Sequence, residues 1–174
     1  FGSVAGGEDL VVVLAVKPQA FGPVAEALRP LASGGALFVS IMAGITLDRM
    51  SAVLGGTRRT VRAMPNTPAA IGKGITAAVA GDGLADGDRG AVERLLAPTG
   101  DFVWIDDEGQ IDAVTAVSGS GPAYFFRFTE ALALAGEGAG LPAPLAMRLA
   151  RATFTGAAAL AEADEASLAE LRRQ

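Results

Sequence analysis

Residues 111–128 read IDAVTAVSGSGPAYFFRF, and this stretch divides the chain into two parts of different character. Apolar residues recur at helical spacing from Ile111 to Val117, which predicts one apolar stripe along a helix. The sequence SGSG at 118–121 should interrupt that helix, because glycine is costly inside helices and serine favours caps. Pro122 suits the first turn of a new helix, where its missing N–H would be unpaired anyway. We therefore predict a helix, a glycine break and a second helix.

Before this stretch, short apolar runs alternate with amphipathic segments. The run LVVVLAV at 10–16 predicts a strand buried on both faces, and Pro30 should end the helix that follows. Further strands are predicted at 36–41, 59–64, 75–80 and 102–105, and helices at 19–29, 47–54 and 88–96. The last of these helices should turn Val92, Leu95 and Leu96 inward. This alternation predicts a doubly wound parallel α/β sheet with right-handed crossovers.

After residue 111 the pattern predicts helices alone, at 122–138, 145–163 and 166–172. We place the domain boundary between residues 106 and 107, so that the domains are 1–106 and 107–174. The helix at 122–138 is apolar over most of its circumference, with large side chains at Tyr124, Phe125, Phe126, Phe128, Leu132 and Leu134. Such a helix has to be buried on several sides, and a second subunit is the expected cover.

Composition removes several classes of mechanism. The 174 residues include no cysteine and no histidine, which excludes disulfides, thiol nucleophiles and serine–histidine pairs, and we expect no metal site. The net charge of −5 and the absence of a basic stripe argue against nucleic-acid binding. The longest apolar run, near 10–16, is too short to span a membrane, and no signal peptide is visible. A cytoplasmic location fits these observations.

Two predicted strand exits are candidate ligand sites, because open α/β sheets bind ligands at the carboxyl ends of their strands. The sequence AVKP at 15–18 could line a dinucleotide site with its backbone and Lys17, or it could be an ordinary exit with a solvated lysine. In SIMAGI at 40–45, Ala43 and Gly44 would let a flat ring approach the backbone. The alternative is a simple turn before a helix capped by Thr46.

Three further stretches carry polar groups with two readings each. Asn66, within MPNTP at 64–68, could donate to a cofactor amide or a substrate, or it could hold the turn by local hydrogen bonds. Glu108 could face an imine nitrogen and stabilise its cationic form, or it could interact with the positive end of the next helix. The SGSG stretch could offer free amides to an anion, or it could simply cap a helix.

Several separated stretches together resemble one family, the pyrroline-5-carboxylate reductases. They are AVKPQ at 15–19, MAGI at 42–45, MPNTP at 64–68, AVTAVSGSGPAYFF at 113–126 and GLPAPLAMRLA at 140–150. The resemblance implies an incomplete Rossmann-type cofactor domain and a helical domain that interlocks with a partner subunit. It also implies hydride transfer from NADPH or NADH to 1-pyrroline-5-carboxylate, which gives L-proline.

The resemblance also implies a set of site residues. The cofactor would be contacted by Ala15, Val16, Lys17, Pro18, Met42, Ala43 and Asn66. Glu108 and Thr115 would lie beside the substrate or the nicotinamide. We assign no catalytic residue, because in hydride transfer the cofactor carries the reaction and needs no protein nucleophile.

The chain departs from the family in two ways. It has no G-x-G-x-x-G loop after a first strand, and the family's glycine-threonine loop for the substrate carboxylate does not occur before Gln174. We expect that both departures reflect truncation and that the polypeptide as given does not turn over. Two alternatives remain: another imine or keto-acid reductase of the same architecture, or a non-catalytic dimerising remnant. The residues that would decide between NADH and NADPH are not in the sequence.

Overall fold

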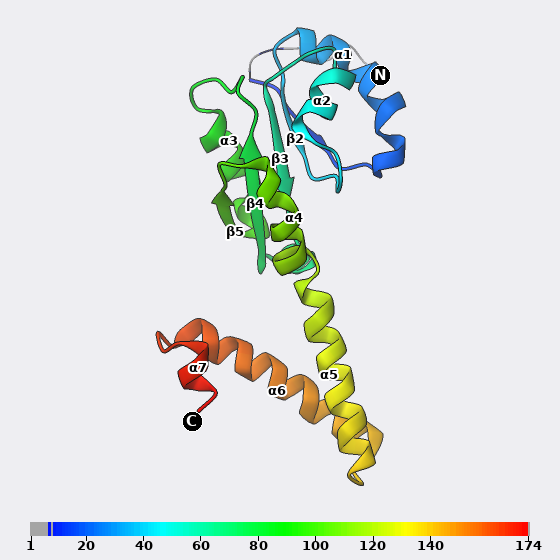
Figure 1. Cartoon of the computed structure of the whole chain (residues 1–174), viewed down its shortest axis with the longest axis vertical. Helices are drawn as coiled ribbons and strands as arrows, with labels where there is room; N and C mark the ends of the chain where they lie inside the picture. Colours follow the sequence, from blue (N-terminus) through cyan, green and yellow to red (C-terminus); the bar gives the residue numbers. More distant parts are fainter. Residues whose placement is uncertain (1–6, 8, 174) are drawn as a thin grey trace. The chain divides into compact units, whose positions relative to one another are not determined.

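The computed structural model describes residues 7 and 9–173. The chain forms two compact units, Phe1–Ser120 and Gly121–Gln174. The first contains the sheet and the second consists of helices (Figure 1). The predicted order of a strand-rich part followed by a helical part is confirmed, because no strand follows residue 104 within the described residues.

Five strands form one sheet in sequence order: β1 (Val11–Leu14), β2 (Leu37–Ser40), β3 (Thr60–Met64), β4 (Gly74–Ala80) and β5 (Gly100–Trp104). Three of the pairings are parallel, but β3 and β4 pair antiparallel. The expectation of an entirely parallel sheet is therefore wrong at this pairing. A parallel crossover needs about a dozen residues or more. Residues 65–73 are too few for one, and they hold only the 3₁₀-helix η2 (Thr67–Ile71).

The first strand is less buried than its apolar sequence predicts. Within β1 only Leu14 is buried, and Val13 is 44% exposed. β1 is the outermost strand of the described sheet and pairs only with β2. No described helix covers the Val13 side of this edge, so burial on both faces is wrong for β1.

Two helices pack on one face of the sheet and form the larger core. α1 (Phe21–Ser33) follows the 3₁₀-helix η1 (Pro18–Ala20), and α2 (Leu47–Val53) follows β2. Their buried side chains join those of the strands in a cluster that includes Leu14, Phe21, Phe38, Met42, Met50 and Leu54.

α1 does not end at Pro30, as the sequence predicts, but continues to Ser33. Proline removes only one intrahelical hydrogen bond here, and this loss falls near the end of the helix. The buried side chain of Ala32 keeps the last turn against the core, and the amide of Gly34 donates to the carbonyl of Pro30.

A single helix, α3 (Asp88–Leu96), packs on the opposite face and leads through the 3₁₀-helix η3 (Ala97–Thr99) into β5. Val92 and Leu96, four residues apart, are buried with Leu37, Val39 and Val61. Leu95 lies beside this stripe and is 41% exposed, so its predicted inward position is wrong. The bounds of the helix are those that the sequence predicts.

The segment after β5 returns to the face that carries α1 and α2. It comprises the 3₁₀-helix η4 (Glu108–Gln110), α4 (Ile111–Val114) and a π-helical turn, Thr115–Gly119. Gly119 lies against β3, because a Cβ built there would stand 2.9 Å from Cε of Met64. Ile111 is buried, but Val117 at the far end of the predicted stripe is 78% exposed.

The predicted glycine break is a π-helical turn instead. The amide of Ser120 donates to the carbonyl of Thr115 at 2.7 Å, and Ser120 keeps a right-handed helical backbone. A π turn absorbs one extra residue within a helix and keeps the backbone hydrogen-bonded. The free amide of Ser120 that an anion site would need is therefore absent here, and the next helix begins at Gly121.

The second unit contains α5 (Gly121–Gly138), α6 (Ala143–Ala163) and α7 (Leu168–Leu171). α5 and α6 pack against each other through small residues: a Cβ built at Gly136 would lie 3.3 Å from that of Ala146. The buried residues of this unit are all small: Gly121, Thr129, Ala133, Ala146 and Ala150. Across residues 7 and 9–173, none of the helices has the length and apolar character that crossing a membrane requires.

Candidate functional site

The loops after β1 and β2 leave the sheet at the same edge, because these strands are parallel and end together at the pair Leu14 and Ser40. Ala15, Lys17 and Ala43 are exposed there. Gly44 has a φ of +72°, and no heavy atom outside residues 43–45 lies within 4 Å of the position that a Cβ would take. The two loops thus form an open surface of small residues beside the carboxyl ends of the strands.

Met42 is the exception within this surface. Its side chain is 3% exposed and belongs to the core of α1 and α2. Its amide donates to Oγ of Ser40 at 3.2 Å, which holds the first turn of the loop. Met42 therefore offers a ligand its backbone but not its side chain.

The side chain of Asn66 does not cap the 3₁₀-helix that follows it, and its hydrogen bond reaches the backbone of β4 instead. Its Oδ1 accepts a hydrogen bond from the amide of Ile75 at 3.0 Å, which joins the loop after β3 to the beginning of β4. The side-chain amide nitrogen makes no hydrogen bond among the described residues, so it remains available as a donor.

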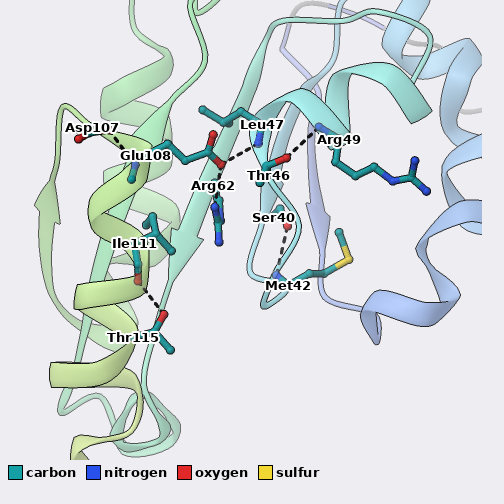
Figure 2. A network of polar contacts seen from close by, with 11 residues as sticks. Ser40, Met42, Thr46, Leu47, Arg49, Arg62, Asp107, Glu108, Ile111 and Thr115 are labelled. Atoms are coloured by element: carbon teal, nitrogen blue, oxygen red, sulfur yellow. Dashed lines mark hydrogen bonds and ion pairs between the residues drawn. The ribbon is translucent and has the colours of Figure 1, made fainter.

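Glu108 connects three elements of the first unit (Figure 2). Its Oε1 accepts from the backbone amide of Leu47 at 2.9 Å and from Nη1 of Arg62 at 2.8 Å. Leu47 is the first residue of α2, Arg62 is in the middle of β3, and Glu108 begins η4. The carboxylate thus interacts with the beginning of another helix rather than with its own, where Asp107 instead accepts from Gly109.

Arg62 has a position in the site that sequence reasoning missed. Its side chain is only 8% exposed, and a buried guanidinium requires a hydrogen-bonded partner of opposite charge. An arginine at the centre of the strand TVRAM, otherwise buried, is the signal that could have identified it. The sequence alone gave no indication that the partner would be Glu108.

A pocket of about 440 Å³ lies over this ion pair. Its lining comes from the loop after β2, from β3 and from the beginning of η4 and α4: Gly44, Thr46, Arg62, Glu108, Gly109 and Asp112. Thr46 caps α2 by accepting from the amide of Arg49, as the sequence predicts. The structure therefore brings the loop after β2 and Glu108 to one pocket, whereas Lys17, Asn66 and Thr115 are not in its lining.

Thr115 begins the π-helical turn, and its hydroxyl donates to the carbonyl of Ile111 at 2.8 Å. Its side chain is half-buried. π-helical turns within α-helices occur frequently at functional sites. In the described part of the chain, no group of three or more acidic side chains could hold a metal ion.

Comparison with known proteins finds the same kind of enzyme for the sheet unit and for the helical unit. A family model described as pyrroline-5-carboxylate reductase dimerisation matches residues 108–174. The pyrroline-5-carboxylate reductase of Pseudomonas aeruginosa is 48% identical over 164 residues, which is 94% of this chain and 60% of that protein. The enzyme of Pisum sativum is 42% identical over 87% of this chain and 55% of its own length.

Solved structures extend this similarity to the fold. A pyrroline-5-carboxylate reductase from Coxiella burnetii superposes with a TM-score of 0.87 at 38% identity, over 94% of this chain and 61% of that one. The pyrroline carboxylate reductase of Plasmodium falciparum, solved with NADP bound, gives 0.82 at 29% identity, over 98% and 68%. These superpositions confirm the predicted Rossmann-type sheet followed by a helical region.

The chain thus spans 55% to 68% of the length of these relatives. Each of these matches covers at least 87% of this chain. The chain is therefore similar to pyrroline-5-carboxylate reductases over nearly all of its own residues.

Proposed function

We propose that the protein containing these residues is an oxidoreductase of proline biosynthesis. It transfers hydride from NADPH or NADH to the C=N carbon of 1-pyrroline-5-carboxylate and releases L-proline. The observation that carries the proposal is the 48% identity to the Pseudomonas aeruginosa reductase, which extends over 94% of the chain. An absence of histidine and cysteine is compatible with this reaction, since hydride transfer requires neither a protein nucleophile nor a metal.

The cofactor is NADP or NAD, and the residues present fit its nicotinamide end. Ala15, Val16, Lys17 and Pro18 would hold it on one loop, and Met42 and Ala43 on the next, with Asn66 as a further donor. The exposed small residues and the open space at Gly44 leave room for a flat ring against the backbone, while Met42 would contribute its backbone alone. When bound, the cofactor supplies the hydride, and these residues orient it.

The substrate end of the site is proposed to lie beside Glu108 and Thr115. Glu108 lies at the pocket that adjoins the loop after β2, and Thr115 follows one turn of α4 later. The contribution of the protein is to orient substrate and cofactor so that the reaction becomes effectively unimolecular. No residue of this chain is assigned as a general acid.

The helical region is proposed to assemble as a homodimer or a higher homo-oligomer, with functional domains 1–106 and 107–174. Two observations support assembly: the match of residues 108–174 to a dimerisation family, and the large apolar side chains exposed on α5. An exposed apolar surface of this kind is typical of a protein interface. A cytoplasmic location without nucleic-acid or membrane partners completes the proposal and is in keeping with the net charge of −5.

The test is oxidation of NADPH and NADH by the protein expressed from its complete gene. We expect oxidation that depends on 1-pyrroline-5-carboxylate, with L-proline as the product. Faster oxidation with a 2-keto acid or another cyclic imine would favour a different reductase of the same architecture. Cofactor binding and turnover that are both absent, in a protein that still self-associates, would favour the non-catalytic remnant.

A further inference from the structure

The beginning of α2 is held from two directions, and one of them is distant in sequence. The first amides of a helix have no partner inside the helix. Thr46 satisfies the amide of Arg49, three residues on, whereas Glu108 satisfies the amide of Leu47 from 61 residues away. The loop that presents Ala43 and Gly44 is therefore fixed at its first turn by Ser40 and at its end by Glu108.

Arg62 fixes Glu108 in turn. It reaches the same carboxylate oxygen, Oε1, from β3, and its own side chain is almost fully buried. A buried arginine on a central strand is held by the packing of the sheet, so its guanidinium is a rigid support for the carboxylate. Leu47, Glu108 and Arg62 thus join the loop after β2, the beginning of η4 and the sheet into one hydrogen-bonded unit (Figure 2).

The charge of Glu108 is already compensated. A carboxylate that is paired with a guanidinium at 2.8 Å has little net field left for a second cation such as a protonated imine. Its Oε1 also carries two hydrogen bonds, one from the backbone amide and one from arginine. This arrangement suits a carboxylate that holds neighbouring backbone in place better than one that binds a cationic substrate.

We propose that Arg62 and Glu108 are a positioning pair. In this role Glu108 orients the loop of Ala43 and Gly44 against the nicotinamide, and does not itself contact the imine nitrogen. The inference rests on the proposed function for the identity of the ligand, but the tie between Glu108 and Leu47 does not depend on it. Loosening the pair should therefore weaken cofactor binding even when no substrate is present.

The experiment compares Glu108→Ala and Glu108→Gln in the protein expressed from its complete gene. Glutamine keeps an oxygen that can accept from Leu47, whereas alanine does not. We expect Glu108→Ala to raise the dissociation constant of NAD(P)H about ten-fold, in the range of a hydrogen bond to a charged group, while Glu108→Gln changes it by less than about three-fold. Fluorescence titration of the reduced cofactor, without substrate, measures both constants.

Arg62→Met and Arg62→Lys test the second member of the pair. Methionine removes the hydrogen bond and the charge that hold Glu108, whereas lysine keeps a positive charge and N–H donors. The lysine variant therefore still tests the pair if the methionine variant fails to fold. We expect the methionine variant to resemble Glu108→Ala and the lysine variant to fall between it and the wild type. Arg49→Met is the matched control. Arg49 is exposed on α2, the helix whose first amide Glu108 binds, and its side chain extends away from Glu108 in Figure 2.

Amide hydrogen exchange of residues 42–47 provides a readout that is independent of any ligand. Faster exchange in Glu108→Ala and Arg62→Met, but not in Arg49→Met, would support the pair. Unchanged exchange in both variants would overturn it. A kcat that falls equally in Glu108→Ala and Glu108→Gln, with unchanged cofactor affinity, would instead show that Glu108 acts on the imine by its charge. Failure of the wild type to bind NAD(P)H would count against the proposed function, while the exchange result would still decide the pair.

Discussion

The sheet unit and the helical unit place their large apolar side chains in opposite environments. In the sheet unit, Phe21, Phe38, Met50 and Leu54 are each at most 2% exposed, and helices cover both faces of the sheet. In the helical unit, the buried residues described are glycine, alanine and threonine. The aromatic side chains of α5, Tyr124, Phe125, Phe126 and Phe128, are each more than half exposed.

This difference shows that apolar content and burial within one chain are separate properties. Both α5 and β2 carry large apolar side chains, yet only those of β2 are buried. Because burial of apolar surface supplies most of the favourable free energy of folding, the sheet unit carries its own stability. In the helical unit the large apolar side chains of α5 are exposed, and we propose that a second subunit covers them. The predictions below test this contrast, beginning with the largest expected effect.

Phe38→Ala should lower the free energy of unfolding of the sheet unit by about 3–5 kcal/mol, the cost of removing a buried aromatic side chain and leaving a cavity. Phe38 is 0% exposed at the centre of the α1 and α2 core. Urea unfolding at two protein concentrations measures the loss, which should be the same at both. A loss below about 1 kcal/mol, or one that depends on concentration, would remove the distinction between the units.

Phe128→Glu should instead act on assembly. Phe128 is 66% exposed on α5, so a charge there costs little in a monomer but disrupts an apolar interface. We expect the dissociation constant of the oligomer to rise by about 30-fold or more, the effect of losing an interface residue worth about 2 kcal/mol. Sedimentation equilibrium measures it, with the exposed Glu137→Gln on the same helix as control. A wild-type protein that is monomeric at low micromolar concentration would contradict the proposed cover.

The sequence predicts well those features that depend on neighbouring residues. The cap at Thr46 and the bounds of α3 follow from side chains within one turn, and the structure confirms both. The two-part division of the chain also follows, because the alternation of short apolar runs with amphipathic segments stops at residue 111. The apolar circumference of α5 is readable in the same way, although the sequence does not show what covers it.

The features that the sequence misses depend on distant partners. The antiparallel pairing of β4 is an exception, because the connection between the predicted strands at 59–64 and 75–80 is already too short for a crossover. Arg62 pairs with Glu108, which is 46 residues away in the sequence. Glu108 also accepts from Leu47 on α2, which is 61 residues away. Pro30 and the SGSG stretch were expected to interrupt helices, but tertiary packing at Ala32 and Gly119 outweighs these local preferences.

A third prediction concerns a polar contribution to the stability of the sheet unit. Asp88 is 4% exposed and accepts from Arg59 at 2.6 and 2.8 Å, and from the amide of Ala85 at 2.8 Å. The hydrogen bonds from Arg59 hold the pKa of the Asp88 carboxyl below its ordinary value. Asp88→Asn should therefore lower the free energy of unfolding by about 1.5–3 kcal/mol at neutral pH.

The stabilisation from Asp88 should depend on pH, and the lowered pKa of its carboxyl sets the direction. Because the folded pKa is depressed, the unfolded state binds more protons as the pH falls below about 3.9, the ordinary value of aspartate. The stabilisation is thus complete above that pH and disappears as the pH falls through the folded pKa. Urea unfolding of wild type and Asp88→Asn should converge in acid. Asp82→Asn is the control, because the Arg58–Asp82 pair is exposed and its loss should leave the unfolding midpoint unchanged.

The smallest expected effect is on the free energy of unfolding, which substitution of Thr76 should leave unchanged or raise rather than lower. Thr76 on β4 is 1% exposed, and its hydroxyl has no hydrogen-bond partner in the described structure. Thr60 on β3 is equally buried, but its hydroxyl donates to the carbonyl of Arg58 at 3.5 Å. A buried hydroxyl without a partner costs free energy that an apolar group of the same shape avoids.

Thr76→Val should therefore leave the free energy of unfolding unchanged or raise it by up to about 1 kcal/mol, whereas Thr60→Val should lower it by about 1 kcal/mol. Both substitutions keep a β-branched side chain in a strand, so the difference between them isolates the hydrogen bond. An equal loss in the two variants would show that the Thr76 hydroxyl has a partner when the protein is in solution. If the predicted difference appears, the sheet unit retains an unsatisfied polar group within a core that is otherwise complete. Its stability would then come from the burial of large apolar side chains rather than from the pairing of every polar group. The large apolar side chains of α5 have no such burial within the helical unit.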